Sequence, residues 1–388
     1  MPDQATITPY EVHDAIGLPA DGARVIARAT RTDSYPVYVT SSRDEAAARL
    51  LDLLGDAAVG VVTDETVEAL YGGALIEALR DGGRDVHVKS LPPGEASKSV
   101  DRAVELWDWL AEGPLGRRDV LVCFGGGVIC DLGGWVASTY MRGVPYLNVP
   151  TTLLAQVDGA LGGKVAANHP SAKNLLGSFH QPVGVVTDVG YLRSVDDRHL
   201  RAGLAESIKK AMIASPQYWR FIDSSCEGLL AREPAALERL VAGASAIKTQ
   251  LIARDPYEED LRRPLNFGHT IGHPLETVTG YGPLLHGEAV AFGMVVESAI
   301  AADRGLMDRE CLDRLIGLLR RCGLPTTADE LPVEVSVDAI VEAMEKVRLI
   351  RAGSLRFVLP VEPGHTVIAD DVRDAEIRAA LGSCGAGG

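Results

Sequence analysis

The stretch DVLVCFGGGVICDLGGWVAS, residues 119–138, decides the fold that we expect for this chain. Its first part is continuous, apolar and β-branched, as buried strands are, and it passes through three glycines into a helical pattern. Backbone N–H groups at the start of a helix attract phosphate, and glycine lets a ligand approach them closely. The stretch therefore predicts a strand, a turn and a helix that can hold a pyrophosphate. A tight turn without a ligand is the alternative, because the pattern is not GxGxxG.

Further runs of the same kind lie on both sides of this unit. Buried strands are predicted at 58–64, 85–91, 145–152 and 183–189. The segments 66–83 and 99–113, between the first strands, carry apolar residues at the spacing of amphipathic helices. Alternating strands and helices predict a parallel sheet with helices on both faces and a ligand at the carboxyl ends of the strands.

The pattern changes after about residue 195. The rest of the chain is mainly helical, and β-rich runs nearly vanish until 355–360. We therefore expect two domains, an α/β domain over residues 1–190 and a mainly α-helical domain over 191–388. The glycine-rich end GSCGAGG, residues 382–388, is expected to be frayed.

Charge and cysteine content limit the class of partner. The chain has 388 residues with 38 Lys and Arg against 53 Asp and Glu, a formal charge of −15. Nucleic acid and anionic membranes need a basic face, so we expect neither as a partner. The six cysteines are widely spaced, which favours reduced thiols. Without a long apolar run or a leader profile, we expect a soluble, cytoplasmic protein.

Polar residues gather after the predicted strands. Asp64 ends the strand at 58–64, where a carboxylate can accept a hydrogen bond from ribose, and Glu95 and Lys98 follow the next strand. Capping or turn roles are the alternative for these three residues. Residues 149–182 mix glycines with polar side chains, which favours a polar pocket over an ordinary polar loop. The polar side chains in that segment are Asp158, Lys164, Asn168, His169, Lys173 and Asn174.

Histidines with metal-ligand spacing lie further along the chain. His269 and His273 are one helical turn apart, and His286 begins another helical pattern. Two imidazoles with a third nitrogen or carboxylate ligand are the arrangement that catalytic Zn²⁺ favours. The third ligand need not be His273, because Glu206 is a good oxygen donor and shares a helix face with Lys209. Histidines satisfied by local hydrogen bonds are the alternative.

Six motifs, in this order and spacing, resemble the dehydroquinate synthase family of sugar-phosphate cyclases. They are GGGVICDLGGWVAS, YMRGVPYLNVPTTLLAQVDGALGGK, NHPSAKNLLGSFHQP, GLAESIKK, LRRPLNFGHTIGH and LLHGEAV, and the match covers roughly residues 58–365. The resemblance implies a Rossmann-like parallel-sheet domain followed by a helical metal-binding domain. It also implies a tightly bound NAD, one divalent metal, Zn or Co, a small-molecule sugar phosphate as substrate, and a homodimer.

The resemblance also implies roles for individual residues. The metal ligands fall on Glu206, His269 and His286. NAD-binding positions fall on Asp64, Glu95, Lys98, Gly126, Gly127, Val128, Ile129, Cys130, Asp131, Thr151, Thr152, Lys164, Lys173, Leu192, Arg193 and Ser194. Substrate and proton-transfer positions fall on Arg142, Asp158, Lys164, Asn174, Lys209, Lys248, Arg262, Asn266 and His273, with Arg142 near the neighbouring subunit's site.

The family chemistry that the resemblance implies is a closed redox cycle. NAD oxidises a ring hydroxyl whose oxygen sits on the metal, phosphate leaves by β-elimination, and the hydride returns. The ring then opens, and an intramolecular aldol reaction closes a carbocycle. NAD is therefore regenerated in each turnover.

Three departures from the family pattern bear on the substrate. Val165 follows the GGK lysine where Thr is usual, Val347, Arg348 and Leu349 replace an Asp-Lys-Lys, and Pro264 precedes LNFGH. These changes favour a neutral sugar phosphate, sedoheptulose 7-phosphate, over the seven-carbon keto acid phosphate. The retained GHTIGH favours the cyclase branch that forms the C7 cyclitol 2-epi-valiolone rather than its 2-epi-5-epi isomer.

Two other activities remain open at this point. Lys248 and Arg262 suit a carboxylate, so a 3-dehydroquinate synthase acting in the shikimate pathway is one alternative. The same architecture serves NAD- and metal-dependent alcohol dehydrogenases, which lack the GGK and KN lysines of this chain.

Overall fold

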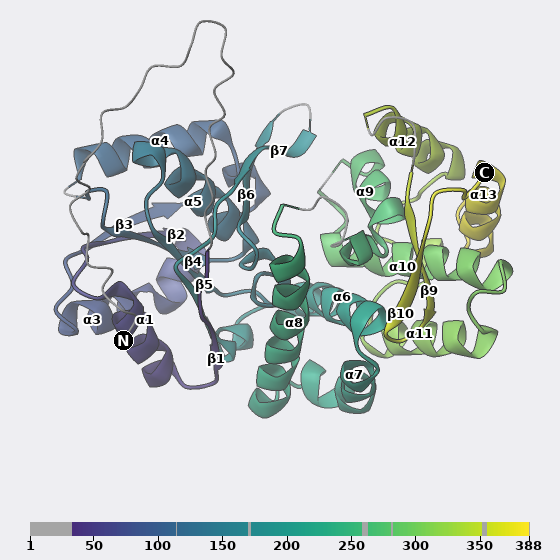
Figure 1. The fold of residues 1–388 in the computed structure, drawn as a ribbon, viewed down its shortest axis with the longest axis horizontal. Helices are drawn as coiled ribbons and strands as arrows, with labels where there is room; N and C mark the ends of the chain where they lie inside the picture. The colour runs from purple at the N-terminus through teal and green to yellow at the C-terminus, as the bar shows by residue number, and fades with distance from the viewer. Residues whose placement is uncertain are drawn as a thin grey trace, which may run out of the picture. The chain divides into compact units, whose positions relative to one another are not determined.

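The fold was obtained as a computed structural model. It describes residues 33–113, 115–169, 172–257, 263–280, 282–350 and 355–387, with the backbone alone for 346–350. A six-stranded sheet is built from the first half of the chain, and helices make up most of the second half (Figure 1). The fold class that the sequence predicts is confirmed. The domain boundary at residue 190 stays a prediction.

The large sheet is parallel throughout. Its strands are β1 (Val37–Thr40), β2 (Val59–Asp64), β3 (Val86–Leu91), β4 (Val120–Gly125), β5 (Tyr146–Pro150) and β8 (Gly184–Asp188). They lie in the order β1-β8-β5-β4-β2-β3. The chain leaves β2 for β3 and returns to β4 on the other side of β2. The carboxyl ends of β2 and β4 therefore flank the point where strand order reverses, which is where open α/β sheets bind ligands.

Helices cover both faces of this sheet. They are α1 (Arg43–Leu54), α3 (Gly73–Asp81), α4 (Val100–Glu112) and α5 (Gly127–Thr139), and a short α2 (Glu65–Val67) and a π-helical turn η1 (Glu68–Gly72) precede α3. Along β4, Val122 packs in one core with residues of α1 and α3, whereas its neighbour Cys123 packs in another with residues of α4 and α5. Successive strand residues face opposite sides, so the two helix pairs lie on opposite faces.

A β-hairpin occupies part of the segment that the sequence marks as a polar pocket. It consists of β6 (Lys164–His169) and β7 (Ala172–Phe179), which pair antiparallel. The hairpin packs closely on α5, because a Cβ placed on Gly134 would lie 2.4 Å from Val165 Cγ1. Glycine at position 134 is therefore needed for this approach.

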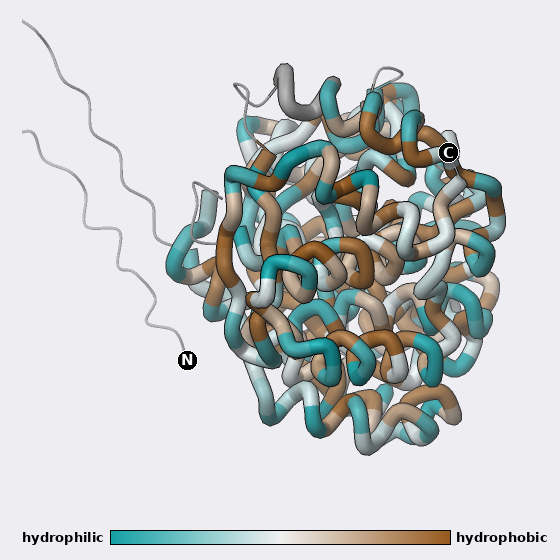
Figure 2. Tube along the Cα trace, turned by 90° about the vertical axis from the view of Figure 1, so that its right-hand side faces the viewer, coloured by the Kyte–Doolittle hydropathy of each residue, from teal (hydrophilic) through white to brown (hydrophobic). Residues whose placement is uncertain are grey.

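The second half of the chain surrounds one buried helix. Its elements are α6 (Asp197–Ala214), α7 (Pro216–Leu230), α8 (Pro234–Arg254), α9 (His269–Val278), α10 (His286–Asp303), α11 (Arg309–Arg321), α12 (Val337–Ile350) and α13 (Asp374–Ser383), with the hairpin of β9 (Phe357–Glu362) and β10 (His365–Ala369). In α10 nearly every residue from Gly287 to Ala302 is buried. Figure 2 shows hydrophilic and hydrophobic residues alternating along the coiled parts of the chain, as expected of helices with one buried face.

Helices α9 and α10 touch along their backbones. A Cβ on Gly293 of α10 would lie only 2.0 Å from the carbonyl oxygen of Gly268, at the start of α9. The buried carboxylate of Glu297 crosses the same contact and accepts hydrogen bonds from the N–H groups of Gly268, at 2.9 Å, and Thr270, at 3.1 Å. The first turn of α9 is thus fixed by α10.

The end of the chain is better ordered than its glycine content suggests. The N–H of Val337 donates to the carbonyl of Gly387 at 2.9 Å, and Ala328 donates to Cys384 at 2.8 Å. The expectation of a frayed tail is therefore wrong up to Gly387, because these backbone hydrogen bonds hold it against the preceding segment.

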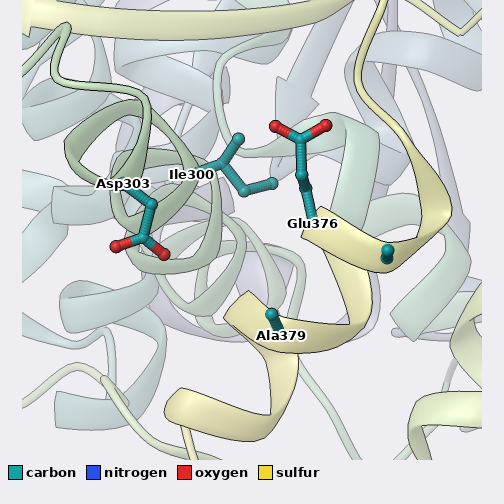
Figure 3. A pocket seen from close by; sticks show the side chains of 5 residues that line it. Ile300, Asp303, Glu376 and Ala379 are labelled. Atoms are coloured by element: carbon teal, nitrogen blue, oxygen red, sulfur yellow. The ribbon is translucent and has the colours of Figure 1, made fainter.

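A small pocket lies between α10 and α13 (Figure 3). It is lined by Ile300, Asp303, Ala375, Glu376 and Ala379. The Glu376 carboxylate is engaged by Arg304, whose Nε lies 2.7 Å from Oε1, and none of the lining residues is among the predicted site residues.

Among the described helices, none is both long enough and apolar enough to cross a membrane.

Candidate active site

Three predicted metal ligands converge from three helices. Glu206 lies in the buried middle of α6, and His269 and His286 are the first residues of α9 and α10. Glu206 Oε1 lies 3.5 Å from His269 Nε2 and 3.6 Å from His286 Nε2. Two imidazoles and one carboxylate leave a fourth position open, which is the donor set of many catalytic zinc sites.

The surroundings of these donors fit a divalent cation. Glu206 is fully buried, yet its Oε1 has no hydrogen-bond partner among the described residues. His269 Nδ1 lies 3.1 Å from the carbonyl of Phe267, and His286 Nδ1 lies 3.2 Å from Glu276 Oε2. In its neutral form each ring can therefore donate through Nδ1 and direct its Nε2 lone pair at the shared space, as metal-binding histidines usually do.

Charges around the cluster set its protonation. Burial, together with the nearby Lys209, holds the pKa of His269 well below its usual range. Burial acts in the same direction on His286, but its interactions with the carboxylates of Glu206 and Glu276 outweigh it and raise the pKa of His286 to about 9, so the metal-free ring is protonated at neutral pH. Burial opposes ionisation of Glu206, yet Lys209 and Lys210 lower its pKa well below the usual value, so the carboxylate is charged.

His273 occupies a different place from the other two histidines. Its side chain is exposed, and its ring centroid lies 4.9 Å from that of His269 and 6.0 Å from that of His286. His273, Glu276 and His286 could also hold a cation by the distances between their donor atoms. However, Glu276 already orients His286, so the Glu206 set suits a metal better.

A cluster of buried lysines adjoins Glu206. Lys209 Nζ lies 2.6 Å from Glu206 Oε2, and Lys210 Nζ lies 3.2 Å from the same oxygen and 2.6 Å from Asp158 Oδ1. Lys248, from α8, lies 3.0 Å from Asp158 Oδ2 and donates to the backbone carbonyl of Asp158 at 2.7 Å. Asp158 itself lies on a π-helical turn, η4 (Ala155–Gly159), after β5.

Most of the predicted NAD positions lie at the carboxyl ends of the parallel strands, whereas Lys164 and Lys173 lie on the β6–β7 hairpin. Asp64 ends β2, Glu95 and Lys98 follow β3, residues 126–131 follow β4, Thr151 and Thr152 follow β5, and residues 192–194 follow β8. The sheet therefore brings to one edge residues that are far apart in sequence. Asp64 also caps α2, since its Oδ1 accepts from the N–H groups of Thr66 and Val67 at 3.0 Å each. The capping alternative thus holds for Asp64 and leaves its second oxygen available.

The start of α5 fits a pyrophosphate. Its N-cap residue, Gly126, provides no side-chain cap for the first N–H groups of the helix. A Cβ on Gly127 would meet nothing within 4 Å, so space is open in front of this turn. Unsatisfied N–H groups facing open space at a helix start are what a phosphate binds.

Lys98 connects the nucleotide side to the predicted substrate side. It is buried, and its ammonium donates to the carboxylate of Asp131 and to the side-chain carbonyl of Asn174. Asn174 adopts a left-handed backbone, with φ 56°, and its N–H donates to Asn168 Oδ1 at 2.9 Å.

Lys173 extends this polar network toward the histidines. Its Nζ lies 3.7 Å from Glu95 Oε1 and also 3.7 Å from Glu276 Oε1. Asn168 donates to Glu95 at 2.8 Å. Glu276 in turn holds His286, so polar contacts run without interruption from the end of β3 to the metal-ligand set.

Four predicted substrate positions are not joined to this cluster by a described contact. Arg142 is exposed in the 3-10 turn η3 (Tyr140–Arg142), Lys164 is exposed at the start of β6, and Asn266 is half-buried at the end of another 3-10 turn, η6 (Arg263–Asn266). Arg262 lies outside the described residues.

Comparison with known proteins identifies the family. Models of the N-terminal and C-terminal domains of 3-dehydroquinate synthase match residues 88–202 and 203–348. A 2-epi-valiolone synthase of Actinosynnema mirum is 52% identical over 372 residues, which are 96% of this chain and 97% of that protein. The chain belongs to the 3-dehydroquinate synthase family. A 3-dehydroquinate synthase of Desulforamulus reducens is 40% identical over 90% of this chain and 96% of that protein.

A solved structure agrees with this assignment. A 2-epi-5-epi-valiolone synthase of Streptomyces hygroscopicus subsp. jinggangensis, with NAD⁺ and Zn²⁺ bound, has a TM-score of 0.86 at 30% identity, covering 93% of this chain and 99% of that one. This member of the 3-dehydroquinate synthase family is an enzyme, a sugar-phosphate cyclase that uses NAD and a divalent metal.

Two residues of this cyclase's site were missed by sequence reasoning. Lys210 follows Glu206 by four positions, and Glu276 follows His273 by three, so both spacings place the pair on one helix face. The spacing was a usable signal in each case. The partners Asp158 and Lys173, however, come from distant segments and could not be inferred from it.

The pH dependence of kcat/KM for this cyclase should reflect the ionisation of Lys248. Burial lowers the pKa of its ammonium to about 8, although Asp158 opposes the shift, so the side chain is a cation below that pH and neutral above it. We expect kcat/KM for a phosphorylated substrate to fall as the pH rises through about 8, because the cation is lost. Lys248→Arg keeps its charge and should move this limb upward by more than about one pH unit. A limb at the same pH in both proteins would contradict the assignment.

Proposed function

We propose that this cyclase converts sedoheptulose 7-phosphate into 2-epi-valiolone, a C7 cyclitol, with release of phosphate. The observation that carries the proposal is the 52% identity with the Actinosynnema mirum 2-epi-valiolone synthase over 96% of the chain. The departures at Val165 and at residues 347–349 support it, because the usual polar residues at these positions belong to enzymes that act on the keto acid phosphate. With this product, the enzyme would act in cyclitol biosynthesis.

The roles of the chain's own residues follow from their positions. Glu206, His269 and His286 would hold the metal, and the start of α5 would hold the NAD pyrophosphate. When bound, the metal polarises a hydroxyl oxygen, and NAD accepts and returns a hydride. Lys209 and Lys248 are buried cations, which attract an anionic substrate and orient it where water is excluded.

Proton transfer needs a group that meets both the site and solvent. His273 meets this requirement, because its side chain is exposed while its ring lies against that of His269. We assign it to proton transfer at the substrate. Asp158, held between Lys210 and Lys248, is oriented for hydrogen bonding but has its charge already offset.

A competition experiment tests the substrate. With both compounds at equal concentration, kcat/KM for sedoheptulose 7-phosphate should exceed that for the seven-carbon keto acid phosphate by about tenfold or more, which needs about 1.4 kcal/mol of discrimination. Mass spectrometry and NMR would identify the product. Dominant 3-dehydroquinate would overturn the proposal in favour of the shikimate-pathway enzyme. Lasting accumulation of NADH would instead indicate an alcohol dehydrogenase.

We further propose a homodimer in which Arg142 reaches the neighbouring subunit's site. Met141 and Arg142 have left-handed φ angles of 48° and 68°, and such strained positions often serve function. The Arg142 side chain is also exposed, so it is available to a partner.

Subunit complementation tests this placement. Arg142→Ala and His269→Ala should each be nearly inactive alone, because one lacks the substrate cation and the other a metal ligand. Mixed dimers should regain activity, since one of their two sites receives both native residues if Arg142 acts across the interface. Absence of recovery in purified mixed dimers would place Arg142 in its own subunit's site.

A further inference from the structure

Lys210 is the most deeply buried lysine of the site. Its side chain is fully shielded from solvent, at 0% exposure, and its ammonium lies between Asp158 Oδ1 at 2.6 Å and Glu206 Oε2 at 3.2 Å. A buried ammonium is costly unless carboxylates offset it. The buried ammonium of Lys210 therefore needs both carboxylates. They belong to two different elements, η4 and α6.

The two oxygens of Glu206 have different surroundings. Oε2 faces the ammonium groups of Lys209 and Lys210, whereas Oε1 receives no hydrogen bond and faces the two histidines. Lys209 has Glu206 as its nearest carboxylate. Lys210 alone among the described residues contacts both Glu206 and Asp158, and Asp158 is anchored to α8 through Lys248. Lys210 thus connects the metal-ligand carboxylate to a fixed point outside α6.

We propose that Lys210 is a positioning residue that holds the Glu206 carboxylate with Oε1 directed at the metal position. The ammonium of Lys210 binds Oε2 of Glu206, and Asp158 holds that ammonium in place. The inference concerns metal binding and does not depend on which sugar phosphate is the substrate.

The direction of an effect on metal affinity separates positioning from simple charge. A lysine near a metal site repels the cation, so its removal should tighten metal binding if charge were all that mattered. If Lys210 orients Glu206, its removal should weaken metal binding, because groups that orient ligands typically contribute about 10- to 100-fold to affinity.

Lys210→Met, which keeps the length of the side chain without its charge, provides the test. Co²⁺ would be titrated into metal-free protein in the absence of substrate, with affinity taken from chelator competition and ligand geometry from the visible Co²⁺ spectrum. We expect affinity about tenfold weaker or more, with an altered spectrum. Unchanged or tighter binding would overturn the proposal.

Lys98→Met is the matched control. It removes another buried lysine, whose ammonium donates to Asp131 and Asn174 and has no described contact with Glu206 or Asp158. Its Co²⁺ affinity, measured without NAD or substrate, should stay within about twofold of the native protein, and a loss equal to that of Lys210→Met would also overturn the proposal.

If Lys210→Met does not fold, a second comparison tests the same proposal. Asp158→Asn removes a carboxylate that would otherwise lose one of its two lysine partners, Lys210 and Lys248, so Asp158→Asn and the double variant Asp158→Asn/Lys210→Met can be compared directly. Weaker Co²⁺ binding in the double variant supports the positioning role. Equal or tighter binding refutes it. If the native protein forms no cyclitol while Lys210→Met still binds Co²⁺ more weakly than the native protein, the proposed substrate is wrong and the positioning role is supported.

Discussion

His269→Ala is expected to lower turnover by about 10³-fold or more and to reduce bound metal to background. Removing one of the three convergent donors leaves Glu206 and His286, too few to hold a catalytic cation in place. A catalytic metal stabilises charge in the transition state by several kcal/mol, and each 1.36 kcal/mol changes the rate about tenfold. Elemental analysis of the purified variant and a product assay with added Zn²⁺ or Co²⁺ would measure both effects.

His199→Ala provides the control for this prediction. His199 lies near the start of α6, the helix that carries Glu206, but its side chain is exposed and pairs with Asp196. Its metal content and turnover should match those of the native enzyme. Full metal occupancy in His269→Ala would remove His269 from the ligand set.

Gly293→Ala is expected to destabilise the fold by about 4 kcal/mol or more, at the upper end for overpacking. The new Cβ would lie 2.0 Å from the Gly268 carbonyl oxygen and 2.9 Å from its carbonyl carbon. These are backbone atoms, which cannot rotate away as a flexible side chain can. Helices α9 and α10 must then separate, and each carries a metal ligand. Urea denaturation of the metal-free protein would measure the change in the free energy of unfolding.

Gly317→Ala is the matched comparison. Gly317 lies inside α11, and a Cβ there meets nothing within 4 Å. Alanine should be neutral or stabilise by up to about 1 kcal/mol, because it is the better helix former. Similar unfolding free energies in the two variants would show that α9 and α10 can part at little cost.

Most strands of the large sheet could be predicted because they are runs of apolar, β-branched residues, which polar residues interrupt only within β3 and, at Asn148, within β5 among the predicted ones. Strand β1 was missed: it has four residues, only one of them fully buried, and its partner β8 lies about 150 positions later. Pairing over that distance leaves no local signal. The β6–β7 hairpin was missed for a different reason, since its small and polar residues lack the alternation that marks a half-buried strand.

The site was partly predictable for similar reasons. The spacing of His269 and His273, with His286 nearby, indicates a metal, and the family resemblance implied Glu206 as the third ligand. The spacing places Lys210 on the same helix face as Glu206, but its role was not predictable, because a lysine beside another lysine normally indicates a solvated helix face. It becomes intelligible only when Asp158, 52 positions earlier, lies 2.6 Å from its ammonium.

Placing both histidines at helix starts has an electrostatic consequence. The first turn of a helix carries the positive end of the helix macrodipole, which repels a cation. In α9 the carboxyl group of Glu297 meets that end at Gly268 and Thr270, and in α10 Glu288 accepts from the N–H of Leu285 at 2.9 Å. Neither group is a free counter-anion, because burial raises the pKa of Glu297 to about 8 and Glu288 is paired with Arg198. The negative charge that faces a bound cation at this junction of two helix starts therefore comes from Glu206, whose pKa Lys209 and Lys210 hold well below its usual value although burial opposes ionisation.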